Sequence, residues 1–171
     1  AGFSVSFERM NRILRLDPEN RIALVEPGVI TSDLQEKASE YALFYPPDPS
    51  SYMVSAIGGN IAENAGGLRC VKYGVTSDYI LGLEIVTASG GIIGTGILSP
   101  DGEEPDLTQV FCGSEGTLGL IVKAAVKLIP APGSLLTLQA EFPAVINAAR
   151  AVTDLLTSGH NPAILEFIDR G

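Results

Sequence analysis

The residues best suited to chemistry lie in one stretch, from Pro46 to Gly74. It holds three prolines, five glycines and only four charged side chains in 29 residues. Glycine leaves the backbone uncovered, while proline and Asx residues hold a loop in one shape. A rigid loop with uncovered amide N–H groups suits a phosphate or a flat heterocycle, particularly where it opens a short helix. The same composition also fits a run of tight structural turns, so the residues alone leave both interpretations open.

A few polar side chains in or near glycine-rich turns each allow two interpretations. Glu63 and Glu115 either cap backbone N–H groups, contact ribose hydroxyls or support residues that contact the ligand. Tyr73 and Cys70 suit the wall of a ring-binding site, and Cys70 is either a packing residue or a covalent flavin anchor. His160, the only histidine, follows Gly159 at a helix end, where capping or solvent exposure competes with a role as base or metal ligand.

Familiar catalytic and metal motifs are absent from the sequence. It has no G-x-x-x-x-G-K-[ST], G-x-G-x-x-G, C-x-x-C, H-E-x-x-H or G-x-S-x-G pattern. One histidine and two distant cysteines, Cys70 and Cys112, cannot assemble a metal cluster of soft ligands. The sequence therefore predicts a cofactor loop without catalytic residues or metal ligands.

Composition narrows the class of partner. The chain has 171 residues, 46% apolar and 18% charged, with a formal net charge of −9. This charge repels nucleic acid and anionic membranes, which leaves small molecules or protein surfaces. The two cysteines could form a pair, but unlinked core residues in a reducing compartment explain them more simply. With no apolar run near the ~20 residues of a membrane span and no basic signal start, this predicts a cytoplasmic protein without membrane insertion. A start without methionine, close to a strand, indicates a fragment of a longer polypeptide.

Hydrophobic periodicity predicts alternating strands and helices. We expect strands over 5–10, 13–16, 21–26, 79–87 and 122–128, and a hairpin turn at 89–91. We expect helices over 32–42, with a capping box from Ser32 to Gln35, over 57–63 and around 107–111. After a boundary at 130–133, strands over 135–142 and 163–168 flank a helix that starts at Pro143. That is half of a split β-α-β unit, which again indicates truncation.

Four motifs follow one another along the chain. They are Pro47-Asp48-Pro49-Ser50-Ser51, Ser55-x-x-Gly58-Gly59-Asn60-x-Ala62-x-Asn64-Ala65-Gly66-Gly67, Lys72-Tyr73-Gly74 and Gly113-Ser114-Glu115-Gly116-Thr117-Leu118-Gly119. Together they resemble the FAD-linked oxidase family related to vanillyl-alcohol oxidase, which has the PCMH-type FAD-binding fold. Within it, the sequence is most similar to the branch of glycolate oxidase and FAD-linked D-lactate dehydrogenase, over nearly its whole length, from Arg9 to Asp169.

The resemblance implies an α+β fold in two parts. Residues 1–130 would form a PCMH-type FAD-binding subdomain, a mixed, largely antiparallel sheet flanked by helices. Residues 131–171 would form the first β-α-β of a ferredoxin-like cap domain. The implied cofactor is FAD, bordered by the proline loop (residues 46–51), wrapped by the glycine turns and approached at its ADP half by the last motif. The implied cofactor-binding residues are Pro47, Asp48, Pro49, Ser50, Ser55, Gly58, Gly59, Asn60, Ala62, Asn64, Ala65, Gly67, Tyr73, Glu115, Gly116, Gly119 and Ile121.

The resemblance also implies an activity for the parent protein. It would oxidise a 2-hydroxy acid of the glycolate or D-lactate class, with hydride passing from C2 to flavin N5 while a base takes the hydroxyl proton. In that branch the base, the substrate-binding arginine and any metal ligands lie in the rest of the cap, so we expect this chain alone to be inactive. Bare strand edges favour a homodimer, and an oxidase complex would add partner subunits. The alternatives are a sister-branch oxidase of larger alcohols, an ether-lipid synthase, or a non-catalytic assembly module.

Overall fold

The computed structural model describes residues 4–100, 102 and 105–168, so the ends of the predicted ranges, 1–3 and 169–171, lie outside the described residues. A five-stranded sheet in the order β1-β2-β6-β4-β5 is central, and every neighbouring pair is antiparallel. Its strands are β1 (Ile13–Asp17), β2 (Ile22–Val25), β4 (Ile80–Val86), β5 (Ile92–Gly94) and β6 (Leu120–Lys127). Two short strands, β3 (Leu43–Phe44) and β7 (Ile129–Pro130), form a second sheet.

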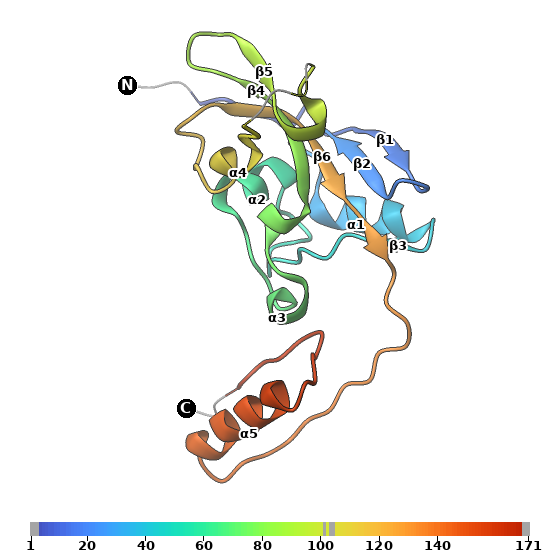
Figure 1. Cartoon of the computed structure of the whole chain (residues 1–171), viewed down its shortest axis with the longest axis vertical. Helices are drawn as coiled ribbons and strands as arrows, with labels where there is room; N and C mark the ends of the chain where they lie inside the picture. The colour runs from blue at the N-terminus through green and yellow to red at the C-terminus, as the bar shows by residue number, and fades with distance from the viewer. Residues whose placement is uncertain (1–3, 101, 103–104, 169–171) are drawn as a thin grey trace.

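Three helices bury side chains in the core of this sheet. They are α1 (Thr31–Ser39), α2 (Ile57–Glu63) and α4 (Thr108–Phe111). Short helical turns also occur as α3 (Cys70–Tyr73), η1 (Thr76–Tyr79) and η2 (Gly96–Leu98). Leu34, Ile61 and Phe111 from the three helices share one apolar cluster with strand residues such as Leu83 and Val126. The helices and loops of the predicted site therefore rest on one rigid sheet (Figure 1).

Most elements predicted for the N-terminal unit, which comprises the described residues from 4 to 130, are confirmed. The hairpin turn links β4 to β5, and the helix predicted over 57–63 is α2. The strand predicted over 5–10 is wrong, because Phe7 and Met10 form a turn in which the Met10 amide bonds the Phe7 carbonyl at 2.8 Å. The carbonyls of Phe7 and Met10 instead pack against Gly28, where a Cβ would collide with them.

The predicted capping box at the start of α1 is also wrong. The helix begins at Thr31, its N-cap is Ile30, and it has no side-chain cap. Ser32 therefore lies inside the helix, and Gln35 faces a different partner. Its Nε2 donates to the carbonyls of Tyr45 and Pro47, each at 3.1 Å. Gln35 thus anchors the proline loop to α1.

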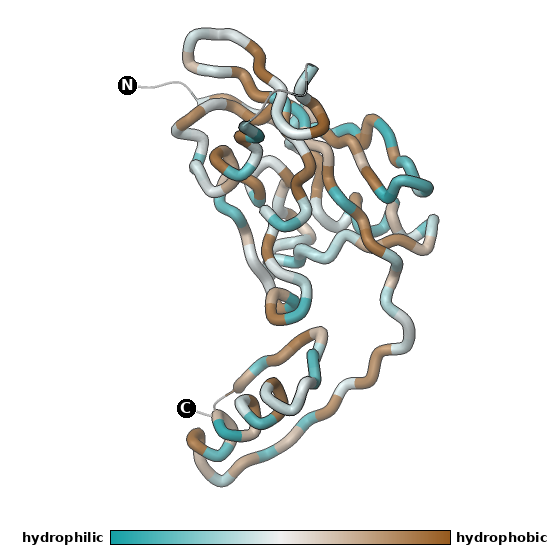
Figure 2. The backbone as a smooth tube through the Cα atoms, in the orientation of Figure 1, coloured by the Kyte–Doolittle hydropathy of each residue, from teal (hydrophilic) through white to brown (hydrophobic). Residues whose placement is uncertain are grey.

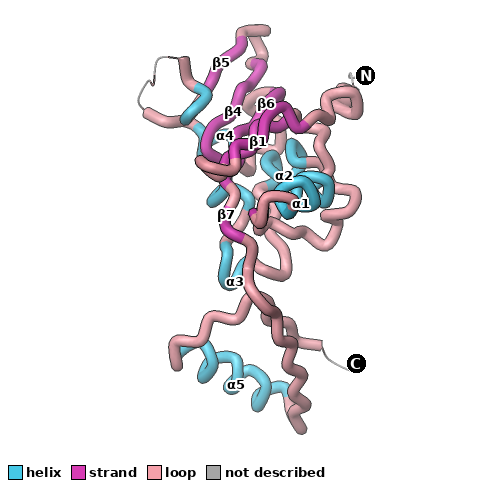
Figure 3. Tube along the Cα trace, turned by 90° about the vertical axis from the view of Figure 1, so that its right-hand side faces the viewer, coloured by secondary structure: helices cyan, strands magenta, loops and turns pink. Residues whose placement is uncertain are grey.

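Beyond Pro130 the chain leaves the sheets as an extended segment, forms α5 (Val145–Thr157) and turns back (Figures 1 and 3). The predicted helix is confirmed, but the strands predicted over 135–142 and 163–168 are wrong, since the described residues there form no strand. In a split β-α-β unit the two strands pair with a strand between them, and residues 131–168 supply none. Figure 2 shows hydrophobic residues spaced along this C-terminal segment.

Candidate functional site

Two glycine-rich segments about fifty residues apart meet at the end of α2. The amide of Gly113 donates to the Ile61 carbonyl at 2.9 Å, and that of Glu115 donates to the Ala62 carbonyl at 2.8 Å. The Ile61 carbonyl also accepts a hydrogen bond from the Asn64 amide at 3.1 Å, so Gly113 adds a second donor there, and Glu115 supplies a donor for Ala62 near the C-terminus of the helix. The fold therefore brings the second and fourth motifs together.

Gly58 is a glycine because the ring and backbone of Pro27 lie against it. A Cβ at residue 58 would lie 2.6 Å from the Pro27 Cβ. The Gly58 amide also donates to the Pro27 carbonyl at 2.8 Å. The Gly58 amide is therefore not one of the uncovered N–H groups that the sequence predicted for this loop, and close packing explains this glycine.

Gly59 has no such explanation. It lies in α2 with an ordinary helical φ, it is exposed, and nothing lies within 4 Å of the position of a Cβ. Its amide donates no hydrogen bond to any other described residue. A glycine inside a helix costs about 1 kcal/mol relative to alanine. Packing thus gives no reason for glycine here, and an exposed glycine whose N–H has no acceptor fits the approach of an anionic group such as a dinucleotide pyrophosphate.

A buried hydrogen-bond network supports this loop from behind. Asn60 Nδ2 donates to Thr31 Oγ1 at 2.7 Å, and Thr31 Oγ1 donates to the Ser55 carbonyl at 3.0 Å and lies 3.2 Å from Ser55 Oγ. Thr31 is fully buried and Asn60 is 5% exposed. The Asn60 side-chain nitrogen is thus occupied within the protein. Sequence analysis missed Thr31, whose role depends on a partner 29 residues away.

Residues 64 and 65, directly after α2, form hydrogen bonds with the first residues of η1. Asn64 ends α2 with φ 49°, and its Oδ1 accepts a 2.9 Å hydrogen bond from the Ser77 amide. The Ala65 carbonyl accepts hydrogen bonds from the amide and the hydroxyl of Thr76, at 3.1 and 2.7 Å. Asn64 tolerates this left-handed conformation better than most residues. These contacts fix the direction of the chain after the helix.

The proline loop is held to the segment before α3 by Asp48. Asp48 Oδ2 lies 3.1 Å from Arg69 Nε, and Asp48 Oδ1 accepts a 3.3 Å hydrogen bond from the Arg69 amide. A Cβ at Gly67 would collide with the Asp48 carbonyl. Burial raises the pKa of Asp48, and the charge of Arg69 offsets this only in part. On either side of Asp48, Pro47 and Pro49 are buried, whereas Ser50 is exposed.

Aromatic and sulfur groups line the same region. The rings of Phe44 and Tyr73 lie edge to face with centroids 6.0 Å apart. Cys70 Sγ accepts a 2.8 Å hydrogen bond from the Gly67 amide, so this thiol has a partner within the protein. Both cysteines are free thiols, and burial raises the pKa of Cys112 to about 11. A hollow of about 70 Å³ borders Phe44, Arg69 and Tyr73 and is closed by C-terminal residues Pro132, Leu135, Ala163 and Ile164.

The fourth motif is a run of left-handed turns before β6. Glu115 and Gly116 have φ values of 52° and 73°, and space near Gly116 is open. Gly119 packs against Ile85, opposite which Ile121 is buried in β6. The carboxylates of Glu63 and Glu115 are exposed and accept no hydrogen bond from any described residue, which argues against the capping alternative. His160 is exposed, and its ring Nδ1 lies 3.1 Å from Ser158 Oγ.

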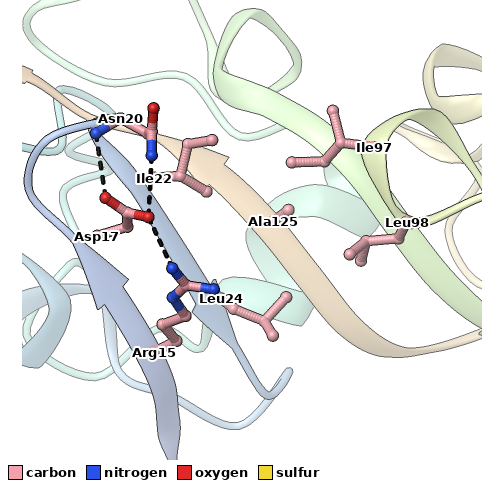
Figure 4. Close-up of a pocket in the computed structure, with 8 residues that line it drawn as sticks. All are labelled: Arg15, Asp17, Asn20, Ile22, Leu24, Ile97, Leu98 and Ala125. Carbon is pink, nitrogen blue, oxygen red and sulfur yellow. Dashed lines mark hydrogen bonds and ion pairs between the residues drawn. The ribbon is translucent and has the colours of Figure 1, made fainter.

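Another hollow, of about 190 Å³, lies between η2 and the part of the sheet formed by β1, β2 and β6 (Figure 4). Its lining includes none of the predicted site residues; it consists of Arg15, Asp17, Asn20, Ile22, Leu24, Ile97, Leu98 and Ala125. Within residues 4–100, 102 and 105–168, no three His, Cys, Asp or Glu side chains gather as a metal site. No helix in the same part of the chain is long and apolar enough to cross a membrane.

Comparison with known sequences identifies relatives along the whole chain. It is 51% identical over 170 residues to glycolate oxidase subunit GlcD of Bacillus subtilis, covering 99% of this chain and 36% of the relative. It is 39% identical to GlcD of Escherichia coli K12, covering 98% and 34%, and 36% identical to a D-lactate dehydrogenase of Anaerostipes hadrus, covering 99% and 36%. The chain thus spans about a third of the length of these relatives.

A solved structure with a similar fold and a matching family profile indicate the same group of proteins. An alkyldihydroxyacetonephosphate synthase superposes with a TM-score of 0.72 and 26% identity, covering 89% of this chain and 27% of that protein. The resemblance to FAD-linked oxidases and the PCMH-type fold are thereby confirmed. The sequence profile described as an FAD binding domain matches residues 1–96. The chain therefore belongs to the FAD binding domain family, and its cofactor is FAD.

Proposed function

We propose that this chain is the FAD-binding part of an oxidoreductase that oxidises the CH–OH group of a small 2-hydroxy acid. The names of the relatives support this class, since they include a glycolate oxidase subunit and D-lactate and D-2-hydroxyglutarate dehydrogenases. The structural observation that carries the proposal is Gly59, whose exposed amide has no acceptor among the described residues and whose glycine no packing contact requires.

The residues that would hold FAD come from the four motifs. Gly59 offers its N–H to a phosphate, and the left-handed turn at Glu115 and Gly116 leaves a second open stretch of backbone. Apolar side chains around Tyr73 suit a flat ring. When bound, FAD supplies a two-electron acceptor for substrate oxidation.

The described side chains contribute positioning. Thr31 and Asn60 hold α2 against α1, while Gln35 and Arg69 hold the proline loop from two sides. Such preorganised support keeps a binding loop in one geometry before the ligand arrives. The division at residue 130, the cap assignment of residues 131–171 and the cofactor contacts of the individual residues belong to this proposal, as do partner subunits like those of the glycolate oxidase relatives.

An ether-lipid synthase is the second candidate, because the solved structure of an alkyldihydroxyacetonephosphate synthase has the same fold. Its 26% identity is lower than the 36 to 51% of the hydroxy-acid relatives, which favours the first candidate. A non-catalytic assembly module would not need the open backbone at Gly59.

The proposal is tested on the complete polypeptide that contains this sequence. We expect it to purify with a flavin absorption band and to reduce a dye acceptor when mixed with D-lactate or glycolate. A colourless protein that acquires no band with added FAD would refute FAD binding. Flavin binding without turnover of any D- or L-2-hydroxy acid would refute the substrate class alone.

A further inference from the structure

Arg69 occupies a position that none of the four motifs assigns. It lies between the second and third motifs, and its side chain is 29% exposed. Its Nε and its backbone amide both reach the carboxylate of Asp48, at 3.1 and 3.3 Å. The guanidinium also lies over the Phe44 ring, 4.8 Å from its centroid. One side chain therefore joins β3, the proline loop and the start of α3.

The partner carboxylate depends on this contact. The Asp48 side chain is only 11% exposed, and no other basic side chain of the described residues forms an ion pair with it. Removing one member of a mostly buried ion pair leaves the other charge without compensation, which is far more costly than losing an exposed pair. Loss of Arg69 should therefore move the proline loop, because the unpaired Asp48 carboxylate is more stable when it is exposed to water than when it stays buried.

Arg69 also borders a hollow that it shares with the C-terminal segment. With Phe44 and Tyr73 it lines the hollow of about 70 Å³ that Pro132, Leu135 and Ile164 close from the other side. The pair with Asp48 thus lies where the N-terminal unit faces residues beyond 130.

We propose that Arg69 is a positioning residue for the flavin, which acts by fixing Asp48 and with it the proline loop. This inference rests on the proposed FAD site. It deepens that proposal because it names a side chain outside the motifs, Arg69, as the group that fixes the geometry of the proline loop beside the flavin ring. The Arg69 side chain orders the loop through one charged Nε–H donor and a ring contact, a combination that lysine reproduces only in charge.

The test uses three single variants of the complete polypeptide, Arg69→Gln, Arg69→Lys and Asp48→Asn. A double variant combines Arg69→Gln with Asp48→Asn. The matched control is Arg15→Gln, which removes an ion pair of similar length, 2.9 Å, from an arginine that is 73% exposed and away from the predicted site. The readouts are the FAD Kd from titration of apoprotein, the absorption spectrum of bound flavin at saturating FAD, and the Tm without FAD.

We expect Arg69→Gln and Asp48→Asn each to raise the FAD Kd about tenfold and to shift the bound-flavin spectrum. The double variant should be no weaker than either single one, since both remove one contact. Arg69→Lys should recover part of the loss, and Arg15→Gln should change Kd less than about twofold.

A lower Tm with an unchanged Kd and spectrum would overturn the inference, because it would show a purely structural pair. Should Arg69→Gln not fold, Arg69→Lys decides by the same readouts, because Asp48 is itself among the implied cofactor-binding residues. Wild-type protein that binds no FAD would overturn the proposed function and this inference together, whereas wild-type binding with unchanged variants would overturn the inference alone.

Discussion

The N-terminal and C-terminal parts of the chain carry similar strand and helix patterns but reach different structures. In the first, alternating segments such as β4 and β6 pair along their length, and Leu83 is fully buried. In the second, the alternating segment around Leu136 and Leu138 stays unpaired, with both side chains 84% exposed. The helix α5 forms all the same, although Ala148 is its only buried residue.

The difference follows from where each element finds its hydrogen bonds. A helix satisfies its backbone within its own segment, whereas a strand needs a neighbour. Residues 80–86 and 120–127 have strand neighbours on both sides, whereas residues 135–140 belong to no strand in the described part of the chain. Apolar alternation thus indicates which face a strand would bury, and a partner decides whether the strand forms.

The largest expected effect comes from truncating one leucine in each region. Leu83→Ala should lower the free energy of unfolding of the 171-residue chain by about 2–5 kcal/mol, because it opens a cavity in the shared core. Leu138→Ala should change it by less than about 0.5 kcal/mol. Denaturant unfolding measures both, and equal losses would show that the C-terminal segment is packed as well as the sheet.

The next effect compares two glycines. Gly67→Ala should cost about 1–3 kcal/mol, since the new Cβ meets the Asp48 carbonyl. At Gly133 nothing lies within 4 Å, so Gly133→Ala should be neutral or slightly stabilising. Thermal unfolding of both variants checks this, and a harmless Gly67→Ala would contradict the close approach of the two loops.

A smaller effect on stability comes from an unsatisfied hydroxyl group in the N-terminal core. Tyr45 is fully buried, and its hydroxyl is the one buried side-chain polar atom without a partner among the described residues. Tyr45→Phe removes that unsatisfied group and should raise the free energy of unfolding by about 1 kcal/mol. Tyr41→Phe, at a ring that is 47% exposed, is the control and should have no effect. A loss of stability in Tyr45→Phe would reveal a hidden hydrogen-bond partner.

The smallest expected effect is a change in the free energy of unfolding that appears only at acidic pH. Hydrogen bonds from the Arg12 side chain and amide lower the pKa of Glu26, which is 5% exposed. A carboxylate with a lowered pKa stabilises the fold above its unfolded pKa of about 4.5, and this contribution is lost as the pH falls through the folded value. The stability advantage of wild type over Glu26→Gln should therefore shrink below about pH 4.5. A constant difference from pH 7 to pH 3 would rule out this linkage, and Glu166→Gln in the exposed C-terminal segment is the control.

Local patterns predicted what depends on neighbouring residues. Period-2 alternation placed β6, and the glycine–glycine start placed α2. Contacts between distant segments were beyond such patterns. They include Pro27 against Gly58, Thr31 with Asn60, and Arg69 with Asp48. Gly58 and Gly59 look alike in the sequence, and only tertiary packing separates a glycine needed for the fold from one that the fold does not need.

Gly59 therefore provides the most direct test of the FAD site. Gly59→Ala and Gly59→Leu should keep the free energy of unfolding without FAD, or raise it by up to about 1 kcal/mol, because both residues favour a helix. Titration of the complete apoprotein should nevertheless show a higher FAD Kd, with Leu worse than Ala and Gly133→Ala unchanged. An FAD Kd equal to that of wild type in both Gly59 variants would contradict the assignment of this open amide to the cofactor.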